Sequence, residues 1–168
     1  MKSQTLPATL LFSLLLSSLA ASAQDHADHH ASVNQHGDQV MGFSHETTTH
    51  HFRLYADGGG IEVQTNSPHD NAGRNQIQQH LAHIAPLFAA GDFSATILVH
   101  SETPPGVPEL QARKAEVSYV FAKTSRGGVI RITTESAPAL LAIHQFLRFQ
   151  ISDHQTGDSL ELSAPGSK

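Results

Sequence analysis

The order of hydrophobic patterns along this chain constrains its fold more than any other feature. Residues 47–55 alternate apolar and polar side chains, residues 61–65 alternate again, and residues 70–90 carry apolar side chains at helical spacing. The same order of patterns returns between residues 117 and 153. Two strand pairs, each followed by a helix, predict an α+β, two-layer fold with a four-stranded, mainly antiparallel sheet and two helices on one face.

The two halves also share local sequence, which indicates a duplicated β-β-α unit. GGGIEVQTNSP in the first half corresponds to RGGVIRITTESAP in the second, and AAGD and QTGD follow the two predicted helices. The glycine-rich stretches at residues 56–60 and 125–128 predict the hairpin turns, since successive glycines supply positive φ angles.

The segments between these elements give further expectations. Pro86 lies inside the first predicted helix and predicts a kink or a break, because an interior proline costs a helix about 3 kcal/mol. Residues 93–100 are predicted to be extended. Residues 103–108 contain three prolines and predict a stiff loop that is not helical.

The N-terminal sequence predicts export. A basic Lys2, an apolar run and Ala21-Ser22-Ala23 are typical of a secretory signal peptide with its cleavage site. We therefore expect a periplasmic or secreted protein without a membrane segment after cleavage. The predicted organisation is a signal peptide in residues 1–23, a disordered tail rich in His and Asp in 24–40, one α+β domain in 41–158 and a flexible C-terminal tail in 159–168.

The amino-acid composition limits the functional groups and partners that this protein can use. The chain has 13 His and no Cys, which excludes disulfides, thiolate metal sites and cysteine nucleophiles. Its formal charge is −5 and it has no run of Lys and Arg, whereas a nucleic-acid partner needs a clustered basic surface. We expect no nucleic-acid partner, and the histidines remain as the candidate functional groups.

The first group of histidines lies in the predicted tail. Cleavage after Ala23 would give a mature chain that starts Gln24-Asp25-His26, where the α-amine, two backbone amides and the imidazole can form the square plane that Cu(II) and Ni(II) favour. Weaker capture by imidazole and carboxylate groups could be added by His29, His30 and His36, with Asp28 and Asp38. The alternative is a solvated tail without a chemical role.

The second group lies in the predicted domain. His50 shares a strand face with Phe52, and His144 lies at the centre of an apolar helix stripe, so both are expected to point between sheet and helices. Each of these histidines, taken alone, is more commonly a hydrogen-bonded core residue. Together they predict a shared metal site for two or three members of one set: His50, His51, His80, His83, His100 and His144.

The ligand chemistry indicates a copper or zinc ion. Imidazole and carboxylate groups suit Cu(II) and Zn(II), and Met41 could add a thioether for Cu(I). A lone methionine is more commonly a core residue.

No catalytic signature stands out. The stretch from His45 to His50 resembles the zinc-protease motif H-E-x-x-H but is one residue too long, and no G-x-S-x-G is present. The sequence therefore favours a metal-binding protein for buffering, storage or delivery of the ion. The alternatives are a metal-dependent enzyme acting on a small exported substrate, and a structural or interaction module without metal. The sequence does not identify a protein partner.

Over residues 41–158 the chain resembles a group of small exported bacterial proteins without an established activity. The resemblance lies in four stretches: MGFSHETTTHHF, HLAHIAPLFAAGDF, TPPGVP and IHQFLRFQISDHQTGD. The resemblance implies export and a single α+β domain. Some members are labelled aspartate carbamoyltransferase, but this chain has an export signal and lacks the S-T-R-T type of phosphate-binding pattern.

Overall fold

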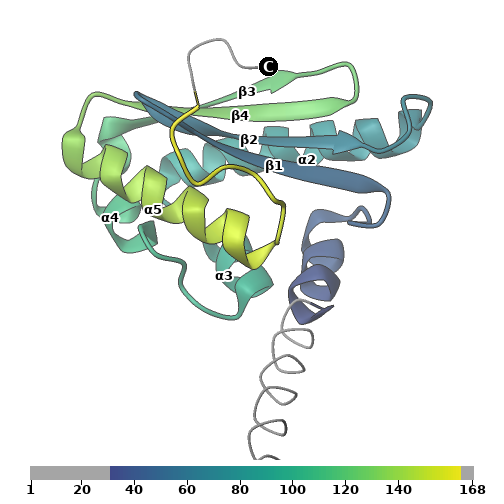
Figure 1. Ribbon diagram of the computed structural model, residues 1–168, viewed down its shortest axis with the longest axis horizontal. Helices are drawn as coiled ribbons and strands as arrows, with labels where there is room; N and C mark the ends of the chain where they lie inside the picture. The colour runs from purple at the N-terminus through teal and green to yellow at the C-terminus, as the bar shows by residue number, and fades with distance from the viewer. Residues whose placement is uncertain (1–30, 164–168) are drawn as a thin grey trace, which may run out of the picture. The chain divides into compact units, whose positions relative to one another are not determined.

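The computed structural model describes residues 31–163 and confirms the predicted two-layer α+β fold (Figure 1). One antiparallel sheet has the strand order β1-β2-β4-β3. The strands and helices are β1 (Thr48–Tyr55), β2 (Gly58–Thr65), α2 (Asn71–Ala90), α3 (Ser94–His100), α4 (Val107–Ala112), η1 (Lys114–Glu116), β3 (Val117–Lys123), β4 (Gly127–Thr134) and α5 (Ala137–Asp153). The element order repeats strand, strand, helix, while a duplicated unit stays a prediction.

The sheet buries one face, and its other face is mainly polar, with Val120 exposed on it. Phe52, Ile61, Ile130 and Ile132 lie on the buried face, where they are 8% exposed or less. Helix α2 packs on β3 and β4, and α5 packs on β1 and β2, so one core lies between sheet and helices. Alternation along β1 therefore places neighbouring side chains on opposite faces.

Helix α2 begins and ends as its sequence predicts. The side chain of Asp70 accepts a hydrogen bond from the backbone amide of Gly73, and Gly91 ends the helix in the left-handed conformation. The predicted break at Pro86 is wrong, because the helix continues to Ala90. Pro86 and Ala82 are both exposed, so water can bond the carbonyl that the proline leaves without an amide donor.

Two predictions for the connecting segment are also wrong. Residues 94–100 form helix α3 instead of an extended segment, and α3 buries Val99 and His100. Residues 103–108 include the start of α4, where Pro108 occupies the first helical turn. A proline is tolerated there because the amide that it lacks has no partner inside the helix.

The glycines 58–60 and 127–128 lie within strands, whereas the sequence predicted turns there. Close packing explains Gly59: a Cβ atom would lie 2.1 Å from Cδ1 of Leu147 and 2.7 Å from the carbonyl oxygen of Arg53. Glycine at this position lets α5 approach the sheet.

The two predicted tails contain ordered residues. Residues 31–41 are helical, although the sequence predicted a disordered tail up to residue 40. Val33 is 1% exposed, so this helix has a buried side, which an estimate from composition does not detect. At the other end, Leu162 forms a parallel bridge with Leu54, and Ser163 donates a backbone hydrogen bond to the Leu54 carbonyl. The predicted signal peptide and residues 24–30 and 164–168 lie outside the described residues.

Within residues 31–163, no single helix is long and apolar enough to cross a membrane. Helices α2 and α3 meet the length and hydropathy requirement only as a pair bent by 108°. Helix α2 buries its apolar side against the sheet.

Candidate functional site

A cavity of about 90 Å³ lies between the sheet and the helices, and four imidazole rings line it. The four histidines come from separate parts of the fold. His50 lies on the buried face of β1, His80 on α2, His100 at the end of α3, and His154 directly after α5. The rest of the wall is mainly apolar.

Ring contacts join these histidines. The rings of His50 and His154 stack with centroids 5.8 Å apart and an angle of 6° between their planes. The ring of His154 also meets that of His100 edge to face, with centroids 5.0 Å apart. Phe43 lies against both His50 and His80, with ring centroids 6.2 Å and 5.6 Å away. Ring contacts therefore connect His100, His154 and His50, and Phe43 connects His50 to His80.

Two of the imidazoles are held neutral. Burial, with smaller contributions from the nearby imidazoles of His80, His51 and His45, lowers the pKa of His50 to about 4. Burial also lowers the pKa of His80 to about 4, with a smaller contribution from His83. At neutral pH both rings keep a nitrogen lone pair for a hydrogen bond or a metal ion.

His100 is oriented by two polar partners on α5. Its Nδ1 atom lies 2.5 Å from Oδ2 of Asp153, and its Nε2 atom lies 3.0 Å from Oε1 of Gln150. His100 is 2% exposed. A buried imidazole paired with a carboxylate through one nitrogen is typical of catalytic and metal-ligating histidines, because the carboxylate fixes the ring orientation.

Three of the six predicted core histidines lie away from the cavity. His83 is exposed on α2. His144 places its Nε2 atom 2.9 Å from the Tyr55 carbonyl oxygen and 3.0 Å from that of Gly58, so its polar group is satisfied by the backbone. His51 lies on the polar face of the sheet, as the alternation of β1 requires.

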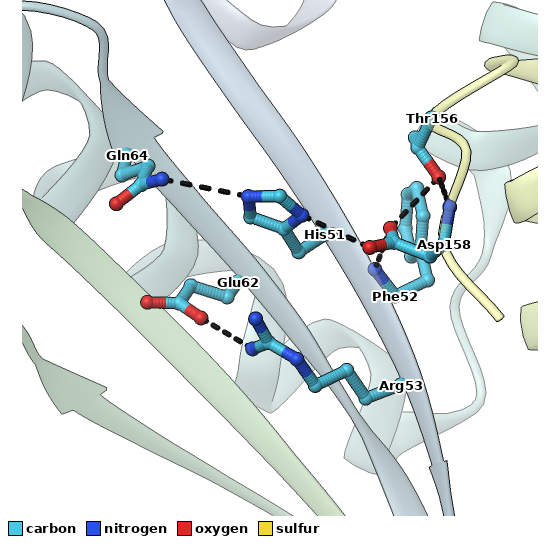
Figure 2. A network of polar contacts seen from close by, with 7 residues as sticks. All are labelled: His51, Phe52, Arg53, Glu62, Gln64, Thr156 and Asp158. Carbon is cyan, nitrogen blue, oxygen red and sulfur yellow. Dashed lines mark hydrogen bonds and ion pairs between the residues drawn. The ribbon is translucent and has the colours of Figure 1, made fainter. Parts of the chain in front are cut away.

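On the polar face, His51 belongs to a network of polar contacts (Figure 2). Nδ1 of His51 lies 3.0 Å from Oδ1 of Asp158, and Oδ2 of Asp158 accepts a hydrogen bond from the Phe52 amide. The Thr156 hydroxyl also donates to this carboxylate, while Gln64 lies beside the other side of the His51 ring. These contacts hold the segment after α5 against β1, close to the chain position that supplies His154 to the cavity.

The structure brings together three of the predicted histidines (His50, His80 and His100) and Met41, which lines the same cavity. Sequence reasoning missed His154, Gln150 and Asp153. Asp153 and His154 fall where the helix pattern ends, and Gln150 follows one turn after Phe146, so helical spacing could have placed Gln150 on the buried side. The candidate tail ligands, Gln24 to His30, lie outside the described residues.

In the described part of the chain, no three His, Asp or Glu side chains already surround a point where an ion could sit. An ion in the cavity would require the ring nitrogens to turn toward it. Ligand rings of one ion have centroids about 5 Å apart, given metal to nitrogen distances of about 2.0–2.1 Å. The separations of 5.0 Å and 5.8 Å around His154 are close to this value. The planes of His50 and His154 are nearly parallel, so one of these two rings has to rotate before both can bind the same ion.

Comparison of the whole chain with protein-family models, with curated proteins and with solved structures found no match.

Proposed function

We propose that this chain is an exported protein that binds a transition-metal ion, Cu(II) or Zn(II), for buffering, storage or delivery. The observation that carries the proposal is the convergence of four imidazoles, from four separate segments, on one cavity. Burying an imidazole is costly unless its polar nitrogens find partners, and the lowered pKa values of His50 and His80 reflect this cost. A ligand shared by these rings explains their place on the wall of the cavity.

The chemistry of the donor atoms supports a borderline metal ion. Neutral imidazole is the commonest metal ligand, and the low pKa values of His50 and His80 favour their neutral form. His50, His80 and His154 are the proposed ligands. His100 is not one of them, because its Nδ1 atom pairs with Asp153 and its Nε2 atom lies 3.0 Å from Oε1 of Gln150.

Export is part of the proposal and rests on Met1–Ala23 alone. The basic start, apolar run and Ala-Ser-Ala ending are the pattern of a cleaved signal peptide. N-terminal sequencing of the protein recovered from the periplasm or the medium tests it. Recovery of an uncleaved chain in the cytoplasm contradicts it.

Metal titration of the full mature chain tests binding directly. We expect stoichiometric binding of Cu(II) or Zn(II) by calorimetry in a competing buffer, with a Kd below about 1 μM, which is a free energy of about −8 kcal/mol. A variant with His26→Ala, His29→Ala and His30→Ala removes the candidate ligands of the tail and should leave one class of sites intact. If this variant binds no metal, the cavity is not the site.

A further inference from the structure

The cavity contains a buried hydrogen-bond donor whose partner is missing from the described residues. Gln150 lines the cavity and is 4% exposed. Its Oε1 atom lies beside His100 Nε2, whereas its Nε2 atom has no hydrogen-bond partner in residues 31–163. Native proteins rarely leave such a group unsatisfied, and a functional site is a common reason when they do.

Either orientation of the Gln150 amide leaves one of its polar atoms without a hydrogen-bond partner in the described residues. Exchanging the oxygen and nitrogen of Gln150 would let the amide nitrogen face His100 Nε2, and the oxygen would then lack a partner. His100 can satisfy only one of the two amide atoms. The orientation in the structure leaves the amide N–H groups for a ligand with a lone pair.

The size of the cavity limits that ligand. A volume of about 90 Å³ is well below the range of about 300–1,000 Å³ that is usual for cofactor and drug-sized ligands. It suffices for an ion and a ligand of a few atoms. Because Gln150 lines the same cavity as His50, His80 and His154, a molecule that accepts its hydrogen bond would also adjoin the proposed metal ligands.

We propose that the metal site keeps one coordination position open for a small exogenous ligand with lone pairs, and that Gln150 donates a hydrogen bond to this ligand. The inference rests on the proposed metal site. The ligand class comprises water, hydroxide and small anions that bind a metal by one atom and accept a hydrogen bond. Gln150 is a positioning residue in this arrangement, since it contacts the ligand and leaves the metal to the imidazoles.

Azide is the probe that tests this proposal. The mature chain with His26→Ala, His29→Ala and His30→Ala, which lacks the candidate copper ligands of the tail, is the parent chain and is unmodified at position 150. It is loaded with one equivalent of Cu(II) and titrated with sodium azide, and the azide-to-copper charge-transfer absorption and the electron paramagnetic resonance spectrum are followed. We expect saturable azide binding to this unmodified parent chain. We expect Gln150→Leu to weaken it about tenfold at unchanged copper affinity, which is the effect of losing one hydrogen bond.

Two further variants make the result decisive. Gln150→Glu keeps the size of the side chain but replaces the donor by a carboxylate, so azide should bind at least as weakly as in Gln150→Leu. Gln76→Leu, at an exposed position of α2, should bind azide like the unmodified chain. Azide binding within twofold of the unmodified chain in both Gln150 variants overturns the role of Gln150. A copper-loaded chain that binds no azide overturns the open position, whereas a chain that binds no copper overturns the proposed function itself.

Discussion

The rings of His50 and His154 lie nearly parallel, 5.8 Å apart between centroids, although one residue is on β1 and the other follows α5. Phe52 contacts the same His154 ring, with centroids 5.7 Å apart. The neighbour of His50 in the chain, His51, lies on the opposite face of the sheet and binds Asp158. One short stretch of β1 therefore helps to place both the cavity histidine His154 and the segment that follows it.

His80 is a proposed metal ligand, and His83 provides its control. Both lie on α2, and only His80 lines the cavity. We expect His80→Ala to weaken Cu(II) or Zn(II) binding at least about tenfold, which is about 1.4 kcal/mol. His83→Ala should leave the affinity within twofold. Calorimetric titration of the two variants measures the difference, and equal losses in both would place the metal outside the cavity.

Asp158 should stabilise the fold by holding the segment after α5 against β1. It accepts a hydrogen bond from the Phe52 amide and lies 3.0 Å from the His51 ring. Asp158→Ala leaves these groups without their partner, and we expect a loss of about 1–3 kcal/mol in the free energy of unfolding. Glu161→Gln, on an exposed part of the same segment, should change it by less than about 0.5 kcal/mol. Denaturant unfolding compares the two variants. Similar losses of stability would mean that Asp158 does not hold this segment against β1.

The stability of the metal-free protein should fall as the pH drops from about 6.5 to about 4. The pKa values of His50 and His80 are lowered to about 4 in the folded state, while both groups return toward 6.5 on unfolding. In this window the unfolded chain binds more protons, so acid favours unfolding and stability rises with pH. Thermal melts at pH 4.5 and 7.0 measure the effect. In His80→Gln the difference between the two melting temperatures should shrink, and a difference as large as in the unmodified chain would contradict the assignment.

Gly59 and Gly60 should differ sharply in their tolerance of a side chain. A Cβ atom at Gly59 would lie 2.1 Å from Leu147 Cδ1, whereas at Gly60 the nearest atom is Cε2 of Tyr55 at 3.4 Å. We expect Gly59→Ala to destabilise the fold by about 1–3 kcal/mol through overpacking, and Gly60→Ala to be nearly neutral. Denaturant unfolding of both variants checks this, and comparable values would mean that α5 is not closely packed on β2.

The sequence by itself determined the strands, the two long helices and the face of β1 on which each histidine lies. Alternation and helical spacing are local properties, and they follow from which side chains can be buried on one face. The ends of α2 at Asp70 and Gly91 were also predictable, since capping depends on the residue and its nearest neighbours.

Only the tertiary structure decided which histidines meet. His144 lies at the centre of an apolar stripe, yet two backbone carbonyls satisfy its ring, while His154 reaches the cavity from beyond the end of α5. Residues 94–100 form a helix despite several β-branched side chains, because a short segment follows the packing of Val99 and His100. A cavity between segments that are distant in sequence depends on long-range packing. Local patterns predict which histidines face the core, but not which of them meet at the cavity.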